Sequence, residues 1–196
     1  RQLASALPCP VGFKNGTDGN IRVAIDAILA SEASHLFTAP GSQGGMVVIK
    51  SEGNPSGHII LRGGTLPNYH QSDVMDAAEC LARQGLNPRL MVDCSHGNSQ
   101  KLHQNQLLVA GELCRQLRGG STAVAAVMVE SFLQGGSQKP APLSELQYGL
   151  SVTDACLGWE ESETLLAMLA DGVMARRQFA HSRPISLRND LGQPVS

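Results

Sequence analysis

The stretch LMVDCSHGNSQK, residues 90–101, contains the pattern from which the fold of the chain can be worked out. Its first three residues are apolar, as in a buried β-strand, and the chain then turns abruptly polar and reaches His96 before Gly-Asn-Ser. A histidine at the end of a strand is often a core residue whose ring is satisfied by hydrogen bonds. The other interpretation places His96 at the mouth of a barrel, where its imidazole binds a ligand.

The same pattern, an apolar run that ends in a charged residue and a polar turn, occurs at three other places. These residues are Lys14 after PVGF, Arg62 after HIIL and Glu130 after AAVMV. Amphipathic segments with helical spacing separate or follow the runs, at 21–33, 72–86, about 99–117 and about 160–177. Short apolar strands that alternate with helices are typical of βα units around a parallel sheet. Two further apolar runs, 35–39 and 45–50, flank Gly-Ser-Gln-Gly and predict a β-hairpin.

The composition is that of an ordinary globular protein, with 42% hydrophobic and 16% charged residues. A net charge of −2 and an aromatic content of only 4% argue against a nucleic-acid partner. No apolar run approaches the roughly 20 residues that span a bilayer, and the first residues lack the apolar segment of a signal peptide. Five cysteines without a CxxC pair indicate reduced thiols. We therefore expect a cytoplasmic α/β protein with no nucleic-acid or membrane partner.

Charged and ligating side chains at the carboxyl ends of successive parallel strands indicate a shared site, as in (β/α)₈ barrels. His96, Glu130 and Asp154, which follows LSVT, would supply one imidazole and two carboxylates, a donor set suited to Mn²⁺, Fe²⁺ or Zn²⁺. Lys14 and Arg62 would add two cations that bind a phosphate or a carboxylate. Taken singly, each residue also has a plain structural interpretation, such as a solvated charge or a helix N-cap. Together they predict a divalent metal beside an anionic substrate.

The sequence contains five long motifs between about residue 7 and residue 177: GFKNGTDG, GNPSGHIILRGGTLPNYH, VDCSHGNSQK, VMVESFL and YGLSVTDACLGWE. In sequence and order these motifs resemble those of the type I 3-deoxy-D-arabino-heptulosonate-7-phosphate (DAHP) synthases. The resemblance implies an α/β fold, a (β/α)₈ TIM barrel of which this chain covers roughly the last four βα units plus the hairpin at 35–50. Residues 1–178 would form the C-terminal half of the synthase domain, and residues 179–196 an irregular tail.

The resemblance also implies a reaction. The family is a transferase that condenses phosphoenolpyruvate with D-erythrose 4-phosphate and water to give DAHP and phosphate, the first step of the shikimate pathway to chorismate and the aromatic amino acids. By motif, Lys14, Arg62 and His96 would bind phosphoenolpyruvate, and Lys14 and His96 would act in catalysis. His96, Glu130 and Asp154 would hold the divalent metal. The family is usually dimeric or tetrameric, so we expect a homo-oligomer.

Several parts of the family's pattern are not found in this chain. They are the fourth metal ligand, a cysteine on the first barrel strand, a Lys-Pro-Arg-Thr segment after the second strand and an arginine after the fourth. We therefore expect a fragment of a longer enzyme that is inactive alone.

The hairpin region resembles the part of the family that binds a feedback inhibitor. By motif position, Leu7, Phe37 and Ala39 fall near that pocket. The sequence mixes features of the tyrosine-, phenylalanine- and tryptophan-sensitive forms, so it predicts an aromatic amino acid without specifying which. The alternative is that the hairpin merely caps the barrel.

Two other functions remain open on the sequence. The sister synthase that makes 3-deoxy-manno-octulosonate 8-phosphate from arabinose 5-phosphate has a similar barrel and lysine motif, although LRGG, PNY and SVTDACLGWE favour the heptulosonate enzyme. A non-catalytic half barrel that binds or regulates a partner would have no need of His96, Glu130 and Asp154 together.

Overall fold

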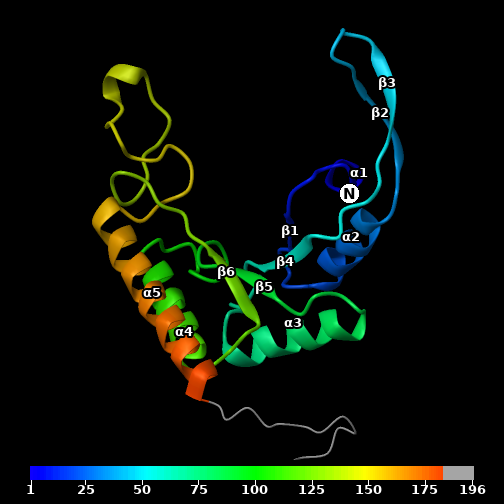
Figure 1. Cartoon of the computed structure of the whole chain (residues 1–196). Helices are drawn as coiled ribbons and strands as arrows, with labels where there is room; N and C mark the ends of the chain where they lie inside the picture. The colour runs from blue at the N-terminus through cyan, green and yellow to red at the C-terminus, as the bar shows by residue number, and fades with distance from the viewer. Residues whose placement is uncertain (183–196) are drawn as a thin grey trace, which may run out of the picture.

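The centre of the molecule is a parallel β-sheet of four strands. The structure, a computed structural model, describes residues 1–182. The strands lie in the order β1 (Val11–Lys14), β4 (Gly57–Leu61), β5 (Leu90–Asp93) and β6 (Val124–Met128) (Figure 1). Each neighbouring pair is parallel. The α/β fold with a parallel sheet, predicted from the apolar runs, is therefore confirmed.

Helices cover one face of this sheet and supply most of the core. They are α2 (Arg22–Glu32), α3 (Gln71–Arg83), α4 (Asn105–Arg118) and α5 (Trp159–Ser182); the short α1 (Gln2–Ser5) precedes β1, and a 3₁₀ turn, η1 (Leu143–Glu145), lies in the loop after β6. Strand residues such as Ile59, Leu61 and Val92 are completely buried beneath the helices. Within residues 1–182, no helix combines the length and the apolar character needed to cross a bilayer.

The limits of α3 show how local sequence starts and stops a helix. The Asp73 carboxylate accepts a hydrogen bond from the backbone N–H of His70, which satisfies a donor at the first turn. At the other end Gly85 has a left-handed φ of 72°, and the N–H groups of Gly85 and Leu86 bond back to carbonyls of the last turn. The helix expected over 72–86 therefore begins one residue earlier and ends three residues sooner.

The opposite face of the sheet carries the side chains that matter for the site. In the register of the strands, Lys14 of β1 lies in one row with Ile60 of β4 and Met91 of β5. Asp93 follows two residues later on β5, on the same face, because side chains alternate along a strand. The carboxyl ends of β1 and β5 therefore direct a lysine and an aspartate to the same side.

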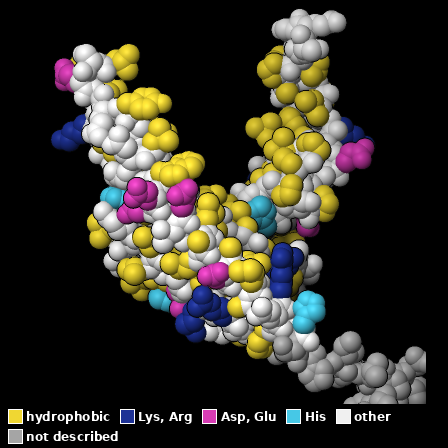
Figure 2. Space-filling model, turned by 60° about the vertical axis from the view of Figure 1, so that its left-hand side comes forward, with side chains coloured by type: hydrophobic (Ala, Val, Ile, Leu, Met, Phe, Trp, Pro, Cys, Tyr) yellow, Lys and Arg dark blue, Asp and Glu magenta, His cyan; other side chains and the backbone are white. Residues whose placement is uncertain are grey.

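Two arms stand away from the sheet (Figure 1). One is the predicted hairpin, an antiparallel pair of β2 (Leu36–Pro40) and β3 (Met46–Lys50), and the other is the loop between β6 and α5. Apolar side chains gather on both arms in Figure 2, and on the hairpin Leu36 and Met46 are each 68% exposed. A lone two-stranded hairpin is only marginally stable in water, so contacts that cover these side chains would stabilise it.

Two segments differ from the sequence-based expectation. α4 begins at Asn105 rather than near residue 99, because Gln100 and Lys101 have left-handed φ values of 54° and 61°, which a right-handed helix does not contain. α5 continues to Ser182, so residues 179–182, expected to belong to an irregular tail, are helical. The rest of that expected tail, 183–196, lies outside the described residues.

Candidate metal and anion site

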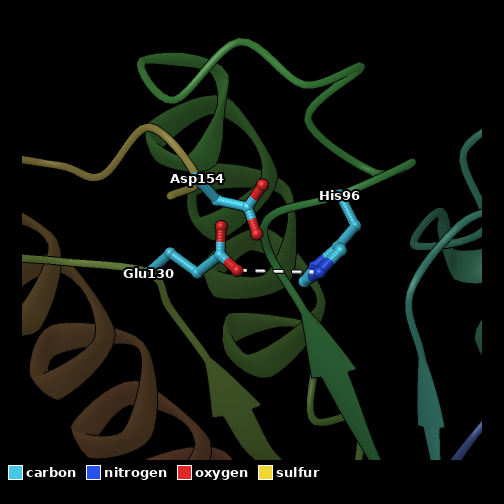
Figure 3. Close-up of side chains that lie close together, drawn as sticks. All are labelled: His96, Glu130 and Asp154. Atoms are coloured by element: carbon cyan, nitrogen blue, oxygen red, sulfur yellow. Dashed lines mark ion pairs between the residues drawn. The ribbon is translucent and has the colours of Figure 1, made fainter. Parts of the chain in front are cut away.

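Three side chains from distant parts of the sequence meet at one point. His96 lies in the turn after β5, Glu130 follows β6, and Asp154 lies in the loop before α5; all three point toward one another (Figure 3). One ligand atom from each residue lies within 4.8 Å of the other two. Nε2 of His96 is 3.6 Å from Oε1 of Glu130. The fold thus brings together the whole group that the sequence proposed as metal ligands.

The imidazole of His96 is held in one orientation. Its Nδ1 lies 2.7 Å from Oγ of Ser95 and 3.0 Å from Oδ2 of Asp93. The Ser95 hydroxyl donates its single proton to Oδ1 of Asp93 at 2.6 Å, so its oxygen can only accept from the ring. Because both neighbours accept, Nδ1 carries the hydrogen, and in the neutral ring Nε2 presents its lone pair toward Glu130. This is the tautomer of a histidine that ligates a metal through Nε2.

Glu130 is fixed through its backbone. The side chain of Gln106, completely buried on α4, donates to the Glu130 carbonyl at 3.0 Å and accepts from its N–H at 2.9 Å. Burial raises the pKa of the Glu130 carboxyl; His96 acts in the opposite direction, and the carboxylates of Asp154 and Asp93 add to the increase. A divalent cation between these carboxylates would offset the crowded negative charge. The oxygen and imidazole donors fit such a cation.

The three side chains line a cavity of about 150 Å³, together with residues of the loops after β4 and β5, among them Arg62, Lys101 and His103. The backbone N–H of Arg62 donates to Oδ1 of Asn15 at 2.8 Å, which fixes the start of this loop. The side-chain Nε of Arg62 is buried and has no hydrogen-bond partner among residues 1–182. A buried donor of this kind is unfavourable until it finds an acceptor. The predicted anion-binding role of Arg62 suits this position.

Lys14 approaches the same region from the end of β1. Its Nζ lies 2.8 Å from Oδ2 of Asp93, and its side chain is 35% exposed. Since β4 lies between β1 and β5, the lysine side chain spans β4 to reach this carboxylate. Burial alone would raise the pKa of Asp93, but hydrogen bonds from Lys14 and Ser95 outweigh it, and the pKa is lowered. Lys14 is therefore joined to His96 through one ionised carboxylate.

Glycines allow the loops after β1, β4 and β5 to come close together. A Cβ added to Gly64 would lie 2.3 Å from the backbone N of Gly19, and one added to Gly63 would lie 2.5 Å from the N of Asn98. These spacings leave no room for any side chain. The RGG sequence after β4 thus packs directly against the backbone of the loops on either side.

Four residues of this region were not identified from the sequence: Asp93, Gln106, Lys101 and His103. Asp93 did carry a signal, because a charged residue directly after LMV in a buried strand requires a partner. Gln106 carried none, since a glutamine in an amphipathic segment is ordinarily a surface residue. Lys101 and His103 were not identified as site residues, because a helix was expected to begin near residue 99.

The residues expected near a feedback inhibitor lie at the base of the hairpin and on it. Phe37 and Ala39 are half-buried on one face of β2, and Leu7 is 47% exposed after α1. A hydrogen bond of 2.6 Å between the hydroxyls of Ser5 and Ser51 ties α1 to the residue after β3. The inhibitor role of these residues stays a prediction.

Comparison with known proteins identifies the family. Residues 1–167 match the model of the DAHP synthetase I family. The chain belongs to this family. Among its relatives in the DAHP synthetase I family, the Trp-sensitive phospho-2-dehydro-3-deoxyheptonate aldolases of Enterobacter agglomerans and Escherichia coli (strain K12) are 55% and 53% identical over 176 residues. Both alignments cover 90% of this chain and 51% of the relative.

A solved structure gives the same result in three dimensions. The phospho-2-dehydro-3-deoxyheptonate aldolase from Francisella tularensis SCHU S4 matches with a TM-score of 0.86 and 41% identity, over 90% of this chain and 51% of that one. The chain therefore spans about half the length of the DAHP synthetase I relatives that it matches. The family resemblance inferred from the five motifs is confirmed.

Proposed function

We propose that the full-length gene product is a DAHP synthase, which condenses phosphoenolpyruvate with erythrose 4-phosphate and water to give DAHP and phosphate. In this proposal the chain supplies about the last four βα units of a (β/α)₈ barrel. The observation that carries the proposal is the convergence of His96, Glu130 and Asp154 within 4.8 Å in a member of the DAHP synthetase I family. A non-catalytic half barrel would have no need of such a donor set.

The positively charged residues of the site bind the anionic substrate. Lys14 and Arg62 bind the anionic groups of phosphoenolpyruvate and orient its C3 toward the aldehyde carbon of erythrose 4-phosphate; the buried, unpartnered Nε of Arg62 supports this role. Two anionic substrates repel each other, so cations are needed to hold them in reacting positions. C3 attacks the aldehyde, water adds at C2, and phosphate leaves by cleavage of the C–O bond.

His96 would lie beside phosphoenolpyruvate and, with Glu130 and Asp154, would hold a divalent cation. Such a cation would supply positive charge to polarise the aldehyde oxygen and to stabilise the developing alkoxide. His96 contributes Nε2, which the hydrogen bonds at Nδ1 leave directed toward Glu130.

Tryptophan is the proposed feedback inhibitor, because the relatives from Enterobacter agglomerans and Escherichia coli carry the name Trp-sensitive. Leu7, Phe37 and Ala39 mark its binding region, which lies at the base of the hairpin and along β2. The exposed apolar side chains of β2 and β3 support assembly into a homo-oligomer, since large exposed apolar patches mark interaction surfaces.

The experiment is an assay of the purified full-length gene product with phosphoenolpyruvate and either erythrose 4-phosphate or arabinose 5-phosphate. We expect DAHP from erythrose 4-phosphate, loss of the activity with EDTA and recovery with Mn²⁺. His96→Ala should abolish the activity and leave the protein folded, as judged by circular dichroism. Preference for arabinose 5-phosphate would indicate the sister synthase, and no product from either sugar would indicate a non-catalytic protein.

A further inference from the structure

Asp93 connects the two halves of the site. Its side chain is completely buried at the end of β5, and its carboxylate interacts with Lys14, Ser95 and His96. Oδ1 accepts hydrogen bonds from the backbone N–H and the hydroxyl of Ser95, at 2.9 Å and 2.6 Å. Oδ2 accepts from Nζ of Lys14 at 2.8 Å and lies 3.0 Å from Nδ1 of His96.

The chemistry of a carboxylate suits this position. An ionised carboxylate only accepts hydrogen bonds, and it offers acceptor sites on both oxygens. Ser95 uses Oδ1 and fixes the plane of the group, which leaves Oδ2 for the lysine and the imidazole. An asparagine has the same shape, but it places donor hydrogens on one side and carries no charge. It cannot accept from all of these partners at once.

We propose that Asp93 is a positioning residue that fixes both the imidazole of His96 for the divalent cation and the ammonium group of Lys14 for the anionic substrate. This inference rests on the proposed function. Asp93 does not line the cavity, so it acts through His96 and Lys14. One carboxylate oxygen thereby sets the spacing between the metal-binding and the phosphoenolpyruvate-binding side chains.

A purely structural role predicts different behaviour. If Asp93 only satisfied buried donors, its replacement would lower the melting temperature and leave the properties of the folded site unchanged. If it positions His96, Mn²⁺ affinity should fall in protein that remains folded. Removing a group that orients a metal-binding histidine typically weakens metal binding about 10–100-fold.

The test compares Asp93→Asn, Ser95→Ala and a control, Asp76→Asn, in the full-length gene product. Asp76 is exposed on α3, so its replacement makes the same chemical change away from the site. Calorimetry measures the Kd for Mn²⁺ without substrate, and steady-state kinetics measure kcat at saturating Mn²⁺ and substrates. Thermal melting reports the folded fraction of each variant.

We expect Asp93→Asn to raise the Kd for Mn²⁺ about 10–100-fold and to lower kcat at least about tenfold at saturating Mn²⁺, because small displacements of reacting groups are costly. Ser95→Ala removes one acceptor of Nδ1 and keeps the carboxylate, so the Kd should rise by a smaller factor. Asp76→Asn should match the wild type.

An Mn²⁺ Kd for Asp93→Asn within about twofold of the control would overturn the inference while wild-type activity upheld the proposed function. If Asp93→Asn does not fold, the Ser95→Ala variant provides the test. An unchanged Kd for Mn²⁺ in Ser95→Ala would then overturn the inference. A wild-type protein that neither binds Mn²⁺ nor forms DAHP would overturn the proposed function itself, and the role of Asp93 with it.

Discussion

Arg62 owes its position to the loop that follows β1. Asn15, which is buried, accepts from the backbone N–H of Arg62 at 2.8 Å and donates to the carbonyl of Gly63 at 3.0 Å. These two bonds hold the start of the loop after β4 against the loop after β1. The guanidinium is therefore placed at the cavity by the fold and needs little rearrangement to meet an anion.

Replacing Arg62 tests its role in binding phosphoenolpyruvate. Arg62→Ala should lower kcat/KM for phosphoenolpyruvate about 10–100-fold, the equivalent of about one charge-assisted hydrogen bond. Arg62→Lys keeps the charge and loses the planar fork, so it should recover only part of the loss. Steady-state kinetics of the full-length gene product give both values. An unchanged kcat/KM for Arg62→Ala would show that Arg62 does not bind phosphoenolpyruvate.

A glycine substitution tests the interlocked loops. Gly63→Ala places a Cβ 2.5 Å from the N of Asn98 at a φ of 72°, so crowding adds to backbone strain. Overpacking typically costs about 1–3 kcal/mol. Gly44→Ala is the matched control, because Gly44 has a φ of 84° but nothing within 4 Å. In urea denaturation Gly63→Ala should reduce the free energy of unfolding more than Gly44→Ala does; equal losses would mean that the loops tolerate the contact.

Among the secondary-structure elements, the strand ends and the starts of α2, α3 and α5 could be predicted from the sequence, and the start of α4 could not. The runs before Lys14, Arg62 and His96 are short and apolar, so strands at these places follow directly from the sequence. The start of α4 depends on tertiary contacts. In the segment before it, the amide of Asn98 donates to the carbonyls of Leu61 and Asp93, and these bonds hold a turn where propensity favours helix.

Packing of α4 against the sheet and α5 gives a prediction at the same scale. Leu113 is completely buried, whereas Leu108 on the same helix is 68% exposed. Leu113→Ala should lower the free energy of unfolding by about 2–5 kcal/mol, from lost burial and the cavity that remains. Leu108→Ala should change it by less than about 0.5 kcal/mol. Similar values for the two variants in urea denaturation would show that α4 buries a different face.

At the scale of the whole molecule, the sequence predicted the order of βα units and the residues at their ends. It also predicted that His96, Glu130 and Asp154 would meet, because parallel strands direct their carboxyl ends to one edge. It did not predict Asp93 as the link between Lys14 and His96. That link depends on a side chain reaching across β4 from β1 to β5, a distance that only the sheet order defines.

The most direct test of the metal assignment is anomalous diffraction from crystals of the full-length gene product grown with Mn²⁺. We predict a peak within about 2.3 Å of Nε2 of His96 and of carboxylate oxygens of Glu130 and Asp154. A peak bound to other residues, or none beside these three at saturating Mn²⁺, would contradict the assignment.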